Sequence, residues 1–248
     1  MSSKVALIDG DITIFQIASA AEQPTDFGDD LWVLWADLKV AKMEFDNTIE
    51  AIREKCDCDG YKIYLTSKNN FRKTVSETYK ANRSGKRKPM LLPALREYAI
   101  EHYGASCVDF LEGDDLIGIA ATSAYKHNHV IYSADKDLKT IAGTHYDPEG
   151  NYVITQKEAD RAFYTQILTG DATDGYHGCP SVGPVSAAKI LDKTDGSRRA
   201  MWEAVVEAYS KKGLDELDAI IQARQAFILT HEFWDEKGNV KLWEPPNA

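Results

Sequence analysis

Acidic residues are concentrated at four places in this sequence, in patterns that suit the binding of divalent metal ions. At the densest place, Glu112, Asp114 and Asp115 lie within four positions, directly after an apolar run at residues 105–110. Carboxylates this close repel one another, and holding them together at neutral pH is unfavourable unless a cation neutralises them. Oxygen atoms are the ligands that Mg²⁺ and Mn²⁺ prefer, so this pattern indicates a metal site.

The other three acidic groups have the same character, because each follows a stretch that is typical of a strand or a tight turn. Their members are Asp9, Asp135, Asp137, Asp171 and Asp174. Asp9 ends the first apolar run of the chain, and we interpret it as a metal ligand rather than as a simple turn residue. Asp11, two positions later, is placed to cap a helix that begins near Ile12.

The hydrophobic pattern predicts an α/β fold in which these groups meet. Short apolar runs predict strands at residues 5–8, 61–66, 105–111 and 129–132. Helical patterns alternate with them, beginning near Ile12 and covering residues 31–55, 91–103 and 116–125. Such alternation predicts a mostly parallel central sheet flanked by helices. Ligands bind beyond the carboxyl ends of the strands in such sheets, and we expect the acidic groups to converge there.

The C-terminal part of the sequence predicts mostly helices. Residues 144–146 and 152–155 flank a turn-rich loop, and helical patterns follow at residues 156–168, 185–191 and in two stretches between 197 and 231. We therefore expect an α/β domain at residues 1–155 and a helical region at residues 156–248. Trp32 and Trp35, in the helix predicted at residues 31–55, are interpreted as core residues.

Residues 68–88 form the only strongly basic stretch, in a chain whose formal net charge is −10. Its cations are Lys68, Arg72, Lys73, Lys80, Arg83, Lys86, Arg87 and Lys88. Phe71 and Tyr79 lie among them, and this combination suits a phosphate backbone whose bases stack on aromatic rings. A solvated charged face is the alternative. The net charge does not argue against nucleic acid as a partner. Without the eight acidic residues of the proposed metal site, the formal net charge of the chain would be only −2.

Composition disfavours several other classes of protein. The chain has 248 residues and is 44% hydrophobic, which allows one large domain or a domain with an appendage. Cys56 and Cys58 form the single close cysteine pair, so a zinc site is disfavoured. The sequence has no long apolar span, signal peptide, nucleophile elbow or P-loop. We expect a reduced, soluble, cytoplasmic protein that does not contact a membrane.

Five motifs occur in the order found in the phage and bacterial 5′-nucleases, and the sequence resembles that family. They are the strand that ends at Asp9, YKANR at 79–83, LEGDD at 111–115, SADKD at 133–137 and GDATD at 170–174. The family includes flap endonucleases and the 5′-nuclease domain of bacterial DNA polymerase I. Within it, the sequence most resembles the stand-alone 5′→3′ exonucleases of tailed phages.

The resemblance implies a PIN-like fold that binds two Mg²⁺ or Mn²⁺ ions. The tighter site would use Asp9, Glu112, Asp114 and Asp135, and the second would use Asp115, Asp137, Asp171 and Asp174, partly through water. One feature departs from the family, which has an aspartate just after the second strand. Here the segment reads Leu65-Thr66-Ser67-Lys68-Asn69, so Ser67 or Asn69 offers at most a neutral oxygen.

The resemblance also implies how DNA is bound. Lys80 and Arg83 match the catalytic cations at the base of a helical arch, which here covers about residues 68–90. Residues 170–192 match a helix-hairpin-helix that binds duplex DNA and, in relatives, also holds a monovalent cation such as K⁺. The residues expected to contact DNA are Arg72, Lys73, Tyr79, Lys86, Arg87, Lys88, Gly178, Ser181, Val182, Gly183, Ser186 and Lys189.

These implications predict a metal-dependent 5′→3′ exonuclease or 5′ flap endonuclease that hydrolyses DNA by in-line attack of water at a two-metal site. Its expected partners are DNA with 5′ ends, flaps, nicks or gaps, the RNA of RNA/DNA hybrids, and other phage replication proteins in a bacterial host. Three alternatives stay open. They are a PIN-type or RNase H-like ribonuclease, a catalytically weak DNA-binding module, and a metal phosphatase suggested by Asp9-Gly10-Asp11.

Overall fold

The computed structural model describes residues 3–123, 128–235 and 237–246. The chain divides into two compact units that are interleaved in the sequence. The first unit comprises Met1–Asn69, Lys86–Asp135 and Gly143–Tyr152, and the second comprises Asn70–Gly85, Lys136–Ala142 and Val153–Ala248. The boundary expected near residue 155 places residues 70–85 and 136–142 in the first domain, whereas their contacts place them in the second unit.

The first unit contains a sheet with the strand order β4-β1-β5-β6-β7. The strands are β1 (Val5–Asp9), β4 (Gly60–Tyr64), β5 (His129–Tyr132), β6 (Gly143–Asp147) and β7 (Gly150–Ile154). β1 pairs in parallel with β4 and β5, and β5 pairs in parallel with β6. Ala6 and Ile8 of β1 are completely buried, as expected for a central strand that is covered on both faces. The predicted α/β fold with a mostly parallel sheet is confirmed.

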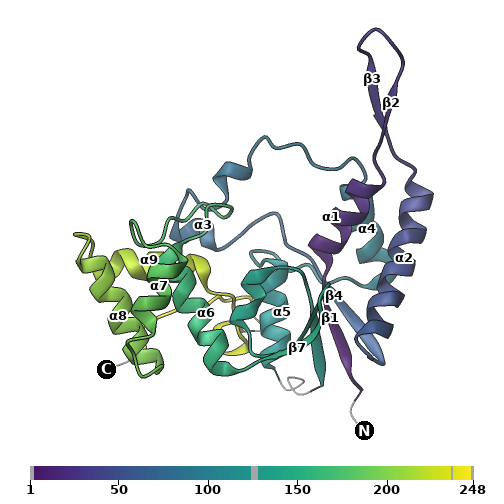
Figure 1. The fold of residues 1–248 in the computed structure, drawn as a ribbon. Coiled ribbons are helices and arrows are strands. Elements are labelled where there is room, and N and C mark those ends of the chain that lie inside the picture. Colours follow the sequence, from purple (N-terminus) through teal and green to yellow (C-terminus); the bar gives the residue numbers. More distant parts are fainter. Residues whose placement is uncertain (1–2, 124–127, 236, 247–248) are drawn as a thin grey trace. The chain divides into compact units, whose positions relative to one another are not determined.

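Helices cover both faces of this sheet (Figure 1). α1 (Gly10–Ala20), α2 (Leu38–Lys55) and α4 (Leu92–Tyr103) pack against one another, and their core includes Ile14, Phe45 and Leu95. α5 (Gly113–Thr122) packs against β1, β4 and β5 from the other side. β1 therefore lies between the layer formed by α1, α2 and α4 and the layer formed by α5.

The first part of the helix predicted at residues 31–55 is instead half of a β-hairpin. β2 (Gln23–Asp26) pairs antiparallel with β3 (Trp32–Trp35), and this hairpin projects from the rest of the first unit (Figure 1). α2 begins only after Asp37, whose side chain accepts hydrogen bonds from two N–H groups of the first turn. Trp32 and Trp35 are 61% and 46% exposed, so the prediction that they belong to the core is wrong.

Residues 105–111, all of which the structure describes, do not form the predicted strand. Ser106 makes an isolated bridge to Tyr64 at the end of β4. At Phe110 the backbone is left-handed, with φ 66°, which ends an extended stretch. α5 begins at Gly113, before the predicted start at residue 116, and the predicted end at residue 125 lies outside the described residues.

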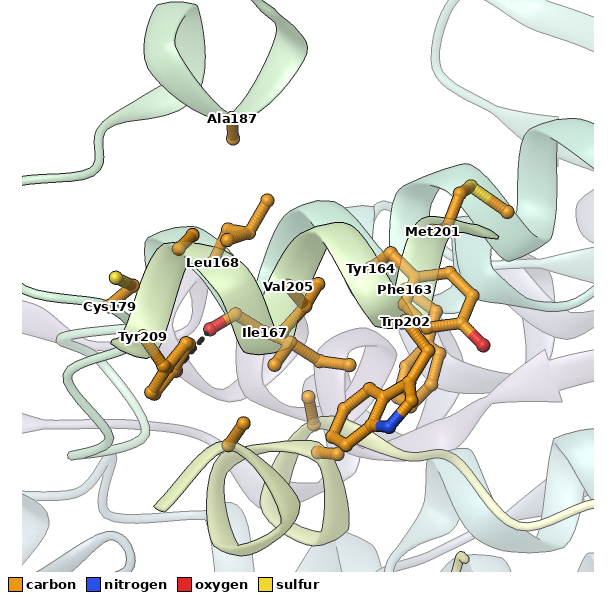
Figure 2. Close-up of a cluster of buried hydrophobic side chains, with 14 of the residues drawn as sticks. Phe163, Tyr164, Ile167, Leu168, Cys179, Ala187, Met201, Trp202, Val205 and Tyr209 are labelled. Carbon is orange, nitrogen blue, oxygen red and sulfur yellow. Dashed lines mark hydrogen bonds between the residues drawn. The ribbon is translucent and has the colours of Figure 1, made fainter. Parts of the chain in front are cut away.

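The second unit is mainly helical, as the sequence predicted for residues 156–231. Its helices are α3 (Arg72–Val75), α6 (Gln156–Thr169), α7 (Pro184–Leu191), α8 (Arg198–Ser210) and α9 (Glu216–Ala226), with 3₁₀ helices at Ala81–Arg83, Lys136–Thr140 and His231–Phe233. Side chains of α6 and α8 form the centre of its core (Figure 2). The Tyr209 hydroxyl donates a hydrogen bond to the backbone oxygen of Ile167 at 2.7 Å, which ties α8 to α6 (Figure 2).

Across the described ranges, none of the helices combines the length and the apolar character needed to cross a membrane.

Candidate active site

Asp9 lies at the carboxyl end of β1, where the sequence predicts a metal ligand. Its buried side chain caps α1 and accepts a hydrogen bond from the N–H of Ile12 at 3.1 Å. Its other carboxylate oxygen accepts a hydrogen bond from the Ser133 hydroxyl at 2.7 Å. Burial raises the pKa of Asp9 to about 6; the two hydrogen bonds partly offset this effect, and the charges of Asp11 and Asp135 add to it.

These surroundings of Asp9 fit a divalent cation. Ionisation of a carboxylate is unfavourable when the group is desolvated and has two like charges nearby. A cation bound there would favour the ionised form instead. Among the residues that the structure describes, no three His, Cys, Asp or Glu side chains are grouped closely enough to hold a metal ion. The full set of ligands therefore stays a prediction.

Asp11 has a different role from the predicted one. It does not cap α1, because Asp9 occupies that position, and the prediction is wrong. Its carboxylate forms an ion pair with Arg96 of α4 and accepts a hydrogen bond from the N–H of Thr66 at 2.7 Å. Arg96 also donates to the carbonyl oxygen of Thr66 at 2.5 Å. Asp11 thus joins α1 to α4 and to the segment after β4.

Glu112, Asp114 and Asp115 lie at the start of α5. Glu112 and Asp115 are buried and form a capping box, in which the N–H of Glu112 donates to Asp115 at 3.1 Å. Negative charge is favourable at a helix N-terminus, so these carboxylates have a structural role beside the predicted metal role. A Cβ at Gly113 would lie 3.3 Å from an oxygen of Asp11, so a side chain at this position of LEGDD would crowd Asp11.

In the second unit, Asp174 contacts both of the residues expected to act on the scissile phosphate. Its carboxylate lies 3.5 Å from the Nζ of Lys80 and forms an ion pair with Arg83. It also accepts a hydrogen bond from the Tyr79 hydroxyl at 3.2 Å. The backbone N–H of Lys80 donates to the carbonyl oxygen of Asp174 at 2.7 Å. The YKANR and GDATD motifs are therefore in direct contact.

The other two carboxylates of the second unit are also held by neighbouring donors. Asp171 forms an ion pair with Lys136 at 2.8 Å and accepts a hydrogen bond from the N–H of Thr173 at 2.7 Å. Burial alone would raise the pKa of Asp171, but the hydrogen bonds from Lys136 and Thr173 outweigh it, so the pKa is lowered. Asp137 accepts a hydrogen bond from Gln166 of α6 at 2.7 Å.

The predicted metal ligands are divided between the two units. The first unit contains Asp9, Glu112, Asp114, Asp115 and Asp135, and the second contains Asp137, Asp171 and Asp174. The chain passes from the first unit to the second directly after Asp135. The SADKD motif therefore contributes one carboxylate to each unit.

Two residues that the sequence assigns to DNA contact are buried, and the structure corrects both assignments. Arg72 is only 2% exposed and donates to the carbonyl oxygens of Gln225 at 2.9 Å and Phe227 at 2.5 Å, at the end of α9. Its guanidinium carbon lies 4.6 Å from the ring centre of Phe71. Tyr79 belongs to the core of the second unit. Both side chains hold residues 70–85 in place rather than presenting a surface to DNA.

The remaining basic residues assigned to the arch lie closer to solvent. Exposed members are Lys73, Arg83, Lys86, Arg87 and Lys88. Arg87 makes a bidentate ion pair with Glu22, with one contact at 2.6 Å. Sequence reasoning missed Glu22, because a single glutamate before a proline-containing connection carries no pattern that identifies an ion pair. It also assigned no role to Ser133, although this residue lies within SADKD.

The glycines between α6 and α7 permit a close approach of two backbone segments. A Cβ at Gly170 would lie 2.3 Å from the carbonyl carbon of His177, and a Cβ at Gly178 would lie 2.3 Å from the nitrogen of Gly170. The N–H of Gly178 donates to Gln222 at 3.0 Å, so it faces a protein side chain. The other residues assigned to duplex DNA are exposed or half-buried: Ser181, Val182, Gly183, Ser186 and Lys189.

The segment that departs from the family pattern supplies no charged ligand. The Ser67 hydroxyl donates to the backbone oxygen of Asn69. The side chain of Asn69 donates in turn to Asp109 at 2.9 Å. The side chains of Ser67 and Asn69 are thus engaged with neighbouring protein groups, which leaves the carboxylates described above as the candidate ligands of the first unit.

Comparison with solved structures supports the fold. The flap endonuclease of phage T5, in a pseudo-enzyme-product complex with DNA and metal ions, matches with a TM-score of 0.65. The match covers 90% of this chain and 92% of that chain at 12% sequence identity, which establishes likeness of fold alone. No family model matches the sequence.

Two phage proteins are similar in sequence over almost the whole chain. The exodeoxyribonuclease of Enterobacteria phage T3 is 30% identical over 280 aligned positions, which cover 97% of this chain and 93% of that protein. The exonuclease of Escherichia phage T7 is 28% identical over 282 positions, with the same coverage. The chain therefore belongs to the phage 5′-nuclease family, and the resemblance found in the sequence is confirmed.

Proposed function

We propose that this protein is a metal-dependent 5′→3′ exodeoxyribonuclease and 5′ flap endonuclease that hydrolyses DNA phosphodiester bonds. The main support is its similarity to the exodeoxyribonuclease of phage T3 over 97% of the chain. The buried carboxylates at the end of β1 and at the start of α5 add the hard oxygen ligands that metal-assisted hydrolysis needs.

Eight carboxylates would hold two Mg²⁺ or Mn²⁺ ions. The first ion would bind Asp9, Glu112, Asp114 and Asp135, and the second would bind Asp115, Asp137, Asp171 and Asp174, partly through water. When bound, such ions lower the pKa of a water molecule and stabilise the entering and leaving oxygens of the phosphate. The hydrogen bonds from Ser133 and Ile12 orient Asp9 for this role in advance.

Lys80 and Arg83 would neutralise the charge that develops on the scissile phosphate. Such stabilisation depends on charges that are positioned before the reaction. Asp174 contacts both side chains, so one carboxylate sets the position of the two cations. We expect both side chains to exchange this contact for the phosphate when DNA binds.

Exposed residues of the basic segment, and residues in α7 and directly before it, would bind DNA. Lys73, Lys86, Arg87 and Lys88 would contact phosphates near the 5′ end, and Ser181, Val182, Gly183, Ser186 and Lys189 would contact the duplex. α7 begins with Pro184, which has no N–H, so the backbone N–H groups of Val185 and Ser186 in its first turn are those that suit a phosphate. A K⁺ ion would bind in the loop that precedes α7. The RNA of RNA/DNA hybrids and other phage replication proteins would be further partners of the protein.

Digestion of labelled DNA tests the proposal directly. Duplex, flap and single-stranded DNA with a 5′ or 3′ label would be incubated with Mg²⁺ or with EDTA. We expect 5′-labelled fragments to be released from duplex and flap DNA, and only with Mg²⁺. RNA and RNA/DNA hybrids in parallel test the ribonuclease alternative, because faster cleavage of RNA than of DNA would overturn the proposed substrate.

A substitution in the predicted metal site provides a second test. We expect Asp135→Asn to abolish cleavage while DNA binding, measured by gel shift, stays largely intact. Asp30→Asn, at the exposed tip of the β2–β3 hairpin, makes the same chemical change and should keep full activity. Unchanged turnover of Asp135→Asn in Mg²⁺ would remove Asp135 from the site.

A further inference from the structure

Glu22 joins the C-terminal end of the basic segment to the end of α1. One carboxylate oxygen of Glu22 accepts hydrogen bonds from Arg87 at 2.7 Å and from the backbone N–H of Met90 at 2.8 Å. The other oxygen accepts from Arg87 at 2.6 Å. All of these residues belong to the first unit.

This contact has the geometry of a specific structural link rather than of a loose surface ion pair. The guanidinium of Arg87 meets both oxygens of the carboxylate, an arrangement that lysine cannot reproduce. The side chain of Glu22 is only 8% exposed although that of Arg87 is largely exposed. The hydrogen bonds from Arg87 lower the pKa of Glu22 to about 2, so the carboxylate is ionised at neutral pH.

The backbone on both sides of the link is well anchored. The N–H of Ala21 donates to Ile17 at 3.0 Å, and that of Glu22 donates to Ser19 at 3.3 Å, so Glu22 continues directly from α1. On the other side, the N–H of Leu92 donates to Pro89 at 3.1 Å, at the start of α4. Residues 86–90 are thus held between the ends of two helices.

The opposite end of α1 is capped by Asp9. An eleven-residue helix is rigid and about 16 Å long. The same helix is therefore capped by a predicted metal ligand at one end and, at the other, leads into the residue that binds Arg87, between Lys86 and Lys88. The distance between the metal ligand and these cations depends on the link at Glu22.

We propose that Glu22 is a positioning residue, which through Arg87 holds residues 86–90 at a set distance from Asp9, so that Lys86 and Lys88 receive the 5′ end of DNA. This inference rests on the proposed nuclease function. Without the link, residues 86–90 would sample many conformations, and fewer encounters with DNA would be productive. Capture of DNA would weaken, while hydrolysis, which uses other residues, would continue.

Kinetics on a flap substrate test the role in DNA capture. We expect Glu22→Gln and Arg87→Lys each to raise KM about threefold to fivefold with kcat nearly unchanged, the range expected for a partly exposed ion pair. Arg87→Lys keeps the positive charge, so its effect separates the link from simple attraction to phosphate. Because both substitutions break the same contact, the double variant should be no worse than either single variant.

Limited trypsin digestion tests the link without DNA or metal. We expect cleavage after Lys86 and Arg87 to be several times faster in Glu22→Gln than in the native protein, at a temperature where circular dichroism shows both to be folded. Glu44→Gln, an exposed residue of α2, is the matched control and should change neither measurement. If Glu22→Gln does not fold, Arg87→Lys serves for both measurements.

The outcomes of the kinetic and proteolysis experiments distinguish the role of Glu22 from the proposed nuclease function. Unchanged proteolysis would overturn the link itself, and faster proteolysis with an unchanged KM, or a fall in kcat alone, would overturn the positioning role. If the native protein cuts no DNA, the nuclease proposal fails, while the proteolysis result still decides whether Glu22 holds residues 86–90.

Discussion

The hydroxyl of Ser133 lies 2.7 Å from a carboxylate oxygen of Asp9 and donates a hydrogen bond to it. The same hydroxyl oxygen accepts a hydrogen bond from the N–H of Asp135 at 2.9 Å. A serine can do both because its hydroxyl is a donor and an acceptor. One small side chain therefore connects the carboxylate of Asp9, at the end of β1, to the backbone of Asp135 in the turn after β5. Both residues are ones that we assign to the first metal ion.

Removal of this hydroxyl should weaken both the fold and the site. We expect Ser133→Ala to lower the free energy of unfolding by about 1.5 kcal/mol, because a buried carboxylate loses a donor. Turnover at limiting Mg²⁺ should fall about tenfold, as is typical when a residue that orients a metal ligand is lost. Urea denaturation and the release of a 5′ label measure the two effects. Ser133→Thr keeps the hydroxyl and should retain more of the Mg²⁺ response; native behaviour of the alanine variant would contradict the assignment.

Arg72 and its neighbour Lys73 should respond to substitution in opposite ways. Arg72 is buried against two carbonyl oxygens at the end of α9, and Arg72→Met would leave both without a charged donor. We expect this variant to lose about 3 kcal/mol of stability in urea denaturation. Lys73 is exposed, so Lys73→Met should leave stability within about 0.5 kcal/mol of native.

DNA binding distinguishes the same two residues. Lys73→Met should weaken binding to all sequences and reduce the slope of log affinity against log salt by about one, because one phosphate contact is lost. Folded Arg72→Met, measured at low temperature, should keep the native slope. A reduced slope for Arg72→Met would mean that the arginine leaves its buried position when DNA binds.

The central sheet could be predicted because its buried strands are recognisable from their local sequence alone. Continuous apolar runs such as that before Asp9 arise where a strand is buried on both faces, and the structure has β1 and β5 at those positions. The five motifs likewise identified the family. The apolar run at residues 105–111 gave the same signal but forms no strand, because the backbone turns at Phe110.

The incorrect predictions share a physical cause. Whether a side chain is buried depends on contacts that a single sequence does not reveal. Trp32 and Trp35 suit a helical core stripe, yet they lie on a hairpin that projects from the first unit. Arg72 has the residue type of a phosphate ligand, yet it is buried against α9, more than 150 positions away in the sequence. The ion pair of Glu22 with Arg87 is also non-local, because it joins residues 65 positions apart.

The stability provided by Glu22 should depend on pH in a defined direction. Its pKa is lowered from 4.5 in the unfolded chain to about 2 in the folded protein. The folded state therefore favours the ionised form, and this contribution is fully present above pH 4.5 and is lost as the pH falls towards 2. We expect the urea midpoints of native protein and Glu22→Gln to differ by a constant amount from pH 5 to pH 8 and to converge below pH 4.5. A difference that persists at pH 2 would show that the carboxylate charge is not its source.

Substitution of Gly170 and of Gly183 by alanine should distinguish a glycine that the fold of the second unit requires from one that we assign to DNA contact. At Gly170 the backbone is left-handed, with φ +67°, and a Cβ would lie 2.3 Å from the carbonyl carbon of His177. We expect Gly170→Ala to lower the unfolding free energy by more than about 2 kcal/mol, since both the conformation and the contact oppose a side chain.

At Gly183, by contrast, a Cβ would meet nothing within 4 Å, and φ is −93°. Gly183→Ala should therefore stay within about 0.5 kcal/mol of the native stability, because alanine restricts the unfolded chain but is a poorer N-cap for α7 than glycine. If the residues at the start of α7 contact duplex DNA as we propose, this added methyl group should still weaken binding to duplex DNA in a gel shift. Its effect on single-stranded DNA should be smaller. Equal affinity of the native and Gly183→Ala proteins for duplex would place the DNA backbone away from Gly183.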